Sequence, residues 1–205
     1  MAKQNDFRQW ARANEESIRS IRACAWDIHE GVNQHYDGDK PYGFHLDMVA
    51  SALTSYGYEV CTGPQDILPL YFGAFFHDTI EDARMTYNDV RKTARRFMND
   101  DQASVAAEIV YALTNEKGRN RHERADERYY GGIRSTPFAP FMKLCDRLAN
   151  ITYSVQGTND SNNHMKLVYR EELPGFLNSL ANNENVDCRF ILPEDMILEI
   201  KKLIL

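Results

Sequence analysis

The residues best suited to chemistry lie in the segment FFHDTIED, residues 75–82. His77 and Asp78 are neighbours of types that bind metals, and Glu81 and Asp82 follow them at i,i+4 spacing, one helical turn later. The apolar run LPLYFGAFF comes directly before them and predicts burial. Because buried carboxylates are unfavourable unless they are paired or bound to a metal, this segment predicts a divalent-cation site. A His-Asp pair alone is common, so the hypothesis requires ligands from elsewhere in the chain.

Two distant segments supply candidate ligands. His45 ends the segment PYGFH, and Asp146 lies in KLCDRLAN, with Asn150 one helical turn after it. Each has an ordinary alternative: His45 could be a helix-terminal or surface histidine, and Asp146 could form an ion pair with Arg147 or Lys143. Tyr42, in the same loop as His45, is expected to fix the position of that loop.

The ordered set PYxxH, HDxxED and KLxDRxxN resembles the hydrolase domain of the RelA/SpoT family, which degrades the alarmones ppGpp and pppGpp of the stringent response. Small stand-alone hydrolases share these motifs, and the resemblance covers roughly residues 25–180. It implies that Glu81 and Asp82 are the catalytic carboxylates and that Asn150 contacts the nucleotide. It also implies that a divalent metal ion, usually Mn²⁺, is held by four residues: His45, His77, Asp78 and Asp146.

The chain departs from the family in a basic, RRKD-like stretch that precedes PYxxH there and helps to hold the guanine nucleotide. Residues 33–36 are Asn, Gln, His and Tyr here, so the arginines and the lysine are missing. His29 and Gly31 fit the family's preceding AHxGQ-like pattern loosely. The resemblance therefore predicts the metal site but not the guanine specificity.

The predicted ligand set indicates the reaction. Two imidazoles and two carboxylates suit manganese, iron or a similar divalent ion, which would polarise the phosphorus centre and lower the pKa of its water. Glu81 and Asp82 would orient that water or accept its proton; alternatively, they support the ligands or form helix-end ion pairs. The predicted reaction on an alarmone is hydrolytic release of pyrophosphate from the ribose 3′ position.

A polyanionic substrate requires local positive charge, because the net charge of the chain is −6. The segment KGRNRHERADER contains Arg121 and Arg124 on one predicted helical face, and Lys143 and Arg147 flank Asp146. These four residues are predicted to bind phosphate, although a solvated, salt-bridged surface helix is the alternative for the first two. By resemblance, Tyr169 lies against the base or ribose, and its alternative is a position in the core.

Helices must position all of these residues. Hydrophobic spacing predicts one long or two short helices over residues 6–34, and a capping box of Thr86 with Asp89 predicts the start of another. The other predicted helices span residues 45–56, 64–82, 86–99, 102–114, part of 117–134, 137–153, 164–181 and 193–204. Weak strand signals occur only at 59–62 and 189–192. The sequence therefore predicts an all-α fold, a single-domain HD-type helical bundle over residues 1–205.

The composition restricts the class of protein. Hydrophobic residues make up 43% and charged residues 26%, as in soluble globular proteins, and the negative charge argues against a nucleic-acid partner. No apolar run is long enough to cross a membrane, and the N-terminus lacks the apolar segment of a secretory signal. The four cysteines lie far apart and predict free thiols in a reducing compartment. We expect a cytoplasmic protein with a small nucleotide substrate; the oligomeric state is not predicted.

Two other functions fit the sequence. The same metal site could act as a phosphatase on another nucleotide, such as NADPH or a nucleoside monophosphate, and the missing basic stretch favours this alternative. The protein could also bind a nucleotide without cleaving it. The presence of both Glu81 and Asp82 argues against a non-catalytic module, since a site that has lost its activity usually lacks one of its catalytic groups.

Overall fold

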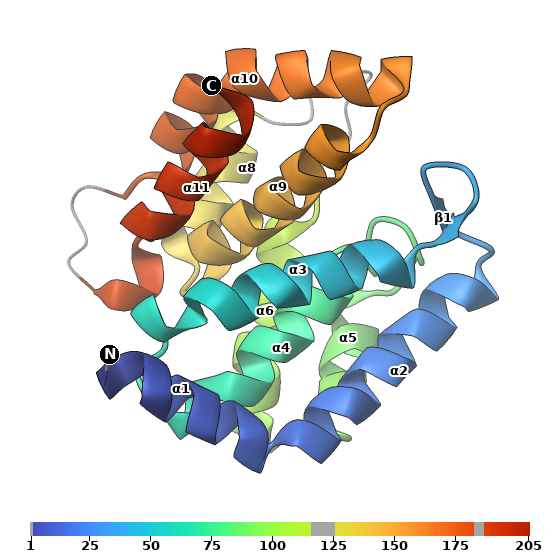
Figure 1. The fold of residues 1–205 in the computed structure, drawn as a ribbon. Helices are drawn as coiled ribbons and strands as arrows, with labels where there is room; N and C mark the ends of the chain where they lie inside the picture. The colour runs from blue at the N-terminus through green and yellow to red at the C-terminus, as the bar shows by residue number, and fades with distance from the viewer. Residues whose placement is uncertain (1, 116–125, 183–186) are drawn as a thin grey trace.

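The computed structural model describes residues 2–115, 126–182 and 187–205, and helices dominate it (Figure 1). The helices of the described residues are α1 (Ala2–Ala13), α2 (Glu15–Gly31), α3 (Gly43–Tyr56), α4 (Ile67–Phe76), α5 (Tyr87–Ala94), α6 (Asp100–Leu113), α8 (Glu127–Ser135), α9 (Ala139–Gln156), α10 (Asp160–Leu180) and α11 (Glu194–Ile204). Short 3₁₀ turns occur at η1 (Gly57–Glu59), η2 (Pro64–Asp66) and η3 (Cys188–Phe190). The all-α prediction is confirmed, and residues 6–34 belong to two helices.

Helix α4 forms the centre of the core. Each of its ten residues is buried, and it packs against α2, α3, α6 and α9. A helix that is apolar on all sides must be surrounded in this way. Gly73 permits the close approach of α6, because a Cβ atom at this position would lie 2.7 Å from Ile109 Cγ2. The apolar run before His77 therefore delivers this residue to the interior, as the sequence predicts.

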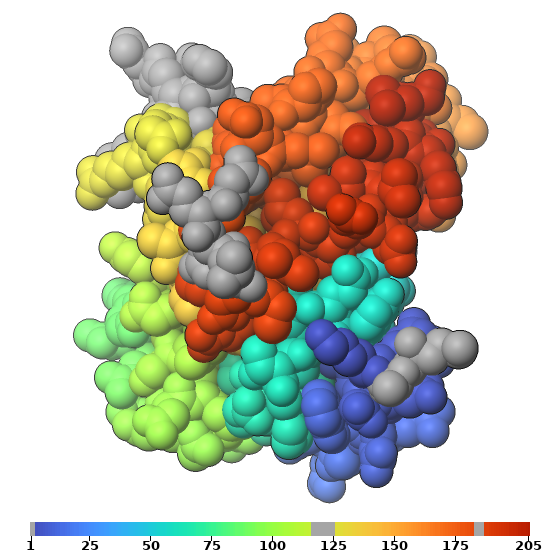
Figure 2. Space-filling model, turned by 90° about the vertical axis from the view of Figure 1, so that its left-hand side faces the viewer, coloured from blue at the N-terminus to red at the C-terminus, as the bar shows by residue number. Residues whose placement is uncertain are grey.

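The helices form two groups that meet at α3, α4 and α9. Helices α8 to α11 gather at one end of the molecule, and α1, α2 and α4 to α6 lie at the other (Figure 1). The same division is visible from the side, where the orange and red segments lie above the blue, cyan and green ones (Figure 2). Contacts of α9 with α3, α4 and α6 join the two groups. No helix among the described residues is long and apolar enough to span a bilayer.

The predicted helix over residues 64–82 is wrong in its last part. Helix α4 ends at Phe76, and the backbone N–H and the hydroxyl of Thr79 both donate to the Phe76 carbonyl, at 3.0 and 2.8 Å. These i→i−3 contacts tighten the chain out of the α-helical path, so residues 77–82 continue as turns. The predicted capping box at the start of α5 is confirmed, with Thr86 and Asp89 bonded reciprocally.

The weak strand signals at residues 59–62 and 189–192 do not correspond to strands, and the 3₁₀ turns η1 and η3 overlap the start of each stretch. Short β-prone segments become strands only when a partner strand is available. The one strand pair in the described part of the chain lies in the predicted loop before α3. It joins β1 (His35–Tyr36) to β2 (Lys40–Pro41), with His35 opposite Pro41 and Tyr36 opposite Lys40.

Candidate metal centre

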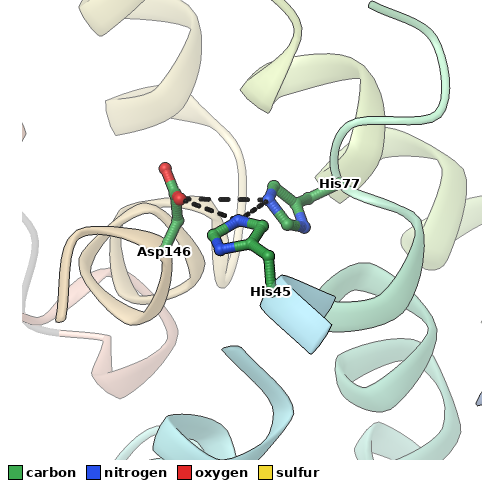
Figure 3. Close-up of side chains that lie close together, drawn as sticks. All are labelled: His45, His77 and Asp146. Atoms are coloured by element: carbon green, nitrogen blue, oxygen red, sulfur yellow. Dashed lines mark hydrogen bonds and ion pairs between the residues drawn. The ribbon is translucent and has the colours of Figure 1, made fainter. Parts of the chain in front are cut away.

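Three side chains from distant parts of the chain converge at one point (Figure 3). His45 comes from the first turn of α3, His77 directly follows α4, and Asp146 lies on α9. The Nε2 atoms of the two histidines are 3.2 Å apart, and Asp146 Oδ1 lies 3.4 Å from His45 Nε2 and 3.9 Å from His77 Nε2. Nitrogen and carboxylate donors at such separations can bind one cation together.

The fourth predicted ligand, Asp78, reaches the same point. Its Oδ2 lies 2.8 Å from His77 Nε2 and 3.8 Å from His45 Nε2. The hydroxyl of Tyr42 donates a short hydrogen bond to this oxygen, which ties the loop before α3 to the turn after α4. His45, His77 and Asp146 thus have ligand atoms within 4.8 Å of one another, and Asp78 contacts both histidines. Only His45 and Asp146 lie on regular helices, because His77 and Asp78 belong to the turn after α4.

A hydrogen bond of His77 directs its Nε2 lone pair toward the centre, where Nε2 of His45 also lies. His77 Nδ1 lies 3.0 Å from the Ala74 carbonyl, which can only accept, so the proton of the neutral ring sits on Nδ1. Tyr36 stacks on the ring of His45, with centroids 5.0 Å apart and an interplanar angle of 12°. Both rings are almost fully buried. Two imidazole nitrogens that face each other in a buried site share either a proton or a cation, and the carboxylates beside them favour positive charge, so the residues present fit a divalent metal ion.

Asp146 is held as an ionised acceptor. Lys143 Nζ donates to its Oδ2 at 2.9 Å, and Asn150 Nδ2 donates to its Oδ1 at 2.7 Å. Burial opposes ionisation, but Lys143 and the two histidines outweigh it and hold the pKa of Asp146 well below its usual range. Although burial lowers the pKa of Lys143, Asp146 raises it above its ordinary value. The carboxylate thus keeps its charge in a buried position.

His77 and Asp78 also stabilise each other's charged forms. Burial lowers the pKa of His77, but the adjacent carboxylate of Asp78 raises it to about 9. Burial in turn disfavours the charged form of Asp78, yet His77 holds the pKa of this carboxyl below its usual range. Both carboxylates are therefore ionised near neutral pH. Two negative charges beside two imidazoles form an environment that a divalent cation would neutralise.

The two predicted catalytic carboxylates lie one turn after the ligands and have different partners. Asn115 donates to Glu81 Oε2 through its backbone N–H at 3.3 Å and its Nδ2 at 3.0 Å. Gln34 Nε2 donates to Asp82 Oδ2 at 2.6 Å. The backbone N–H of Asp82 bonds to the Asp78 carbonyl at 2.8 Å, so the predicted i,i+4 relation persists in the turn.

The predicted substrate residues are only partly brought to the centre. Lys143 and Asn150 contact Asp146, and the Oδ1 of Asn150 accepts from the Tyr36 hydroxyl at 2.9 Å. Arg147 instead lies between α9 and α10, where its Nη1 donates to Glu172 Oε2 at 2.8 Å.

The rings of Tyr169 and Phe176 lie 4.9 and 4.1 Å from the guanidinium carbon of Arg147. Tyr169 is buried, as its core alternative requires. Arg121 and Arg124 lie outside the described residues, so their predicted contact with phosphate remains a prediction.

Two further residues beside the ligands, Gln34 and Tyr36, were not predicted from the sequence. Tyr36 joins His45 to Asn150, and Gln34 joins His29 to Asp82. Both occupy the stretch where the sequence departs from the family pattern. Their spacing could have indicated a shared role. Residues 34 and 36 lie on either side of the first residue of a strand, and alternate residues along a strand face the same side.

The fold and the geometry define a class of protein: an all-α chain with two histidines and two aspartates at its candidate metal centre. No protein-family model matches the chain, and no curated protein matches its sequence. Among solved structures, it is similar to a metazoan ortholog of SpoT that hydrolyzes ppGpp and plays a role in starvation responses. The similarity covers 91% of this chain and 94% of that chain, with a TM-score of 0.58 and 20% identity. The chain therefore shares the fold of this SpoT ortholog, and the predicted HD-type fold is confirmed.

Proposed function

We propose that this protein is a metal-dependent phosphohydrolase that releases pyrophosphate from the 3′ position of ppGpp. The convergence of four side chains carries the proposal: His45, Asp78 and Asp146 each place a donor atom within 4 Å of His77 Nε2. The fold shared with a protein that hydrolyzes ppGpp supports the choice of substrate. In this proposal residues 1–205 are one catalytic domain that acts in the cytoplasm on a small nucleotide, in keeping with its four free cysteines.

In the proposed reaction, different residues of the chain have different roles. A divalent cation held by the four ligands would supply Lewis acidity at phosphorus, and the mixed nitrogen and oxygen donors suit Mn²⁺. Asp82 accepts a proton from the attacking water, and Glu81 orients that water. Lys143 offsets the negative charge that gathers at Asp146 and the substrate. The buried rings of His45 and His77 exclude other water from the ligands.

The test is hydrolysis of purified ppGpp with added Mn²⁺, followed by measurement of pyrophosphate. We expect Asp78→Asn to lower kcat/KM by roughly 100-fold or more, because it removes one ligand charge. Asp6→Asn makes the same chemical change at an exposed position of α1 and should leave the rate unchanged. A wild-type protein that releases no pyrophosphate, or an Asp78→Asn variant of full activity, would contradict the proposal.

A second substrate class is favoured by one observation. Residues 33–36 carry no arginine or lysine, and two of them, Gln34 and Tyr36, bind the site's own Asp82 and Asn150. A nucleotide with a single ribose phosphate, such as NADPH with its 2′-phosphate, or a nucleoside monophosphate would need fewer cationic contacts than ppGpp. The same assay distinguishes the classes, since these substrates release orthophosphate and ppGpp releases pyrophosphate.

A further inference from the structure

The side chain of Gln34 lies between Asp82 and a buried histidine. Its Nε2 donates to Asp82 Oδ2 at 2.6 Å, and its Oε1 lies 2.5 Å from His29 Nδ1. Three side chains from α2, the segment before β1 and the turn after α4 thus form one hydrogen-bonded chain. This chain reaches a predicted catalytic carboxylate without passing through any of the four metal ligands.

The chemistry of the groups fixes the direction of both hydrogen bonds. An ionised carboxylate only accepts, so the amide nitrogen of Gln34 faces Asp82 and its oxygen faces His29. The amide oxygen also only accepts, so His29 carries its proton on Nδ1. His29 is fully buried and stacks on Tyr42, with ring centroids 4.6 Å apart. The donor at the far end of the chain is therefore held in one orientation.

The backbone also fixes the position of Gln34. Helix α2 ends at Gly31, and Asn33 has a left-handed φ of 55°, a conformation that asparagine adopts more readily than most residues. This turn brings the N–H of Gln34 to the carbonyl of His29 at 3.0 Å, and β1 begins at the next residue. Gln34 is thus anchored to α2 by its backbone as well as by its side chain.

One oxygen of Asp82 remains available for chemistry. Within the part of the chain that the structure describes, Oδ2 accepts from Gln34 and Oδ1 has no hydrogen-bond donor. We propose that Gln34, held by His29, is a positioning residue that orients the Asp82 carboxylate so that Oδ1 receives the proton of the attacking water. This inference rests on the proposed function and deepens it, because it adds two residues that set the rate of the chemical step.

Gln34→Met tests the role in turnover, since it keeps the length of the side chain, adds no charge and removes both amide contacts. We expect kcat to fall roughly 10- to 100-fold, while KM and the Mn²⁺ affinity measured by calorimetry each stay within about twofold. Gln9→Met, at an exposed position of α1, should leave kcat unchanged. A Gln34→Met variant with wild-type kcat, or one that loses Mn²⁺ affinity as strongly as kcat, would overturn the proposal.

The His29 end of the chain has its own matched pair of variants. His29→Asn keeps an amide N–H near the place of Nδ1, whereas His29→Ala removes the donor. We expect His29→Asn to retain a kcat several times that of His29→Ala when both variants are folded, as judged by circular dichroism. Equal loss in both variants would mean that the buried ring matters for packing alone, and would remove His29 from the proposal.

A spectroscopic measurement tests the contact without any turnover. In ¹H–¹⁵N spectra, a side-chain amide proton of Gln34 should be shifted downfield by its hydrogen bond to the carboxylate, and it should move upfield in Asp82→Ala while the Gln9 signal stays. An unchanged Gln34 signal in Asp82→Ala would overturn the positioning role even in an active enzyme. A wild-type protein that cleaves no nucleotide but shows the shift would refute the proposed function and leave the contact established.

Discussion

His77 binds either a proton or a metal ion at the same atom. Its Nδ1 is committed to the Ala74 carbonyl, so only Nε2 can change its partner. Burial lowers the pKa of His77, but Asp78, 2.8 Å away, raises it to about 9. Because a histidine ligand must be neutral, binding of a cation has to displace this proton.

We therefore expect the apparent Mn²⁺ affinity to rise with pH up to about 9, the pKa of His77. Below this value, each unit of decrease in pH should lower the affinity by about tenfold, since one proton competes with the cation. The stability of the metal-free protein depends on pH in the opposite direction. Because folding raises the pKa of His77, its protonation stabilises the native state fully below the unfolded pKa of about 6.5, and this contribution is lost as the pH rises through about 9. Calorimetric Mn²⁺ titrations across this range measure the dependence, and an affinity independent of pH would contradict it.

The hydroxyl of Tyr42 lies outside the ligand set and bonds directly to the carboxylate of Asp78. Tyr42→Phe removes this bond but keeps the ring that stacks on His29. We expect Mn²⁺ affinity to fall roughly tenfold, as when an outer partner of a ligand is removed. Tyr87→Phe is the matched control, because its hydroxyl bonds to the exposed Glu108 at 2.7 Å, away from the ligands. Equal Mn²⁺ affinities of the two variants in calorimetry would refute the role of Tyr42.

Among the individual residues, the candidate ligands could be selected from the sequence because their motifs are local and chemically specific. The segment HDxxED combines ligand types with an apolar helix, and this combination is visible in a single stretch of sequence. The roles of Gln34 and Tyr36 could not be predicted in the same way. Their partners, Asp82 and Asn150, lie far away in the chain, and nothing in an amide or a phenol indicates which distant carboxylate or amide it will contact.

Helices were predictable from periodicity, whereas the details of their ends were not. A stripe of apolar residues indicates a helix because that stripe must face a core, and α3, α6 and α9 follow this rule. Helix α4 is different, since it is apolar on every side, and periodicity cannot show where such a helix ends. At its end the N–H and the hydroxyl of Thr79 both bond to the Phe76 carbonyl, and an apolar pattern gives no sign of these contacts.

The close packing of α4 against α6 gives a prediction of stability. A Cβ atom at Gly73 would meet Ile109 Cγ2 at 2.7 Å, so Gly73→Ala should force the helices apart and lower the free energy of unfolding by about 1–3 kcal/mol. Gly132→Ala in α8 is the control, since no atom lies within 4 Å of its added Cβ; it should stabilise by about 0.5–1 kcal/mol. Urea unfolding measures both, and a Gly73→Ala variant as stable as the wild type would contradict the prediction.

Across the molecule, the candidate metal centre lies where the two groups of helices meet. His45 and His77 come from α3 and the end of α4, and Asp146 comes from α9, which packs against both helices. A cation bound at this point would hold together segments that lie far apart in the sequence, such as those of His45 and Asp146. Binding would therefore stabilise the native state against global unfolding, in addition to any effect on catalysis.

This coupling predicts that metal binding raises the melting temperature. A ligand at 100 times its Kd adds about 2.7 kcal/mol to the free energy of unfolding, which for a chain of this size corresponds to roughly 5–10 °C. Thermal unfolding followed by circular dichroism, with excess Mn²⁺ or with a chelator, measures the shift. Asp146→Asn removes the ligand contributed by α9 and should abolish the shift, while Asp6→Asn on α1 should preserve it. A shift of equal size in Asp146→Asn would mean that the cation binds elsewhere, and α9 would then have no part in the centre.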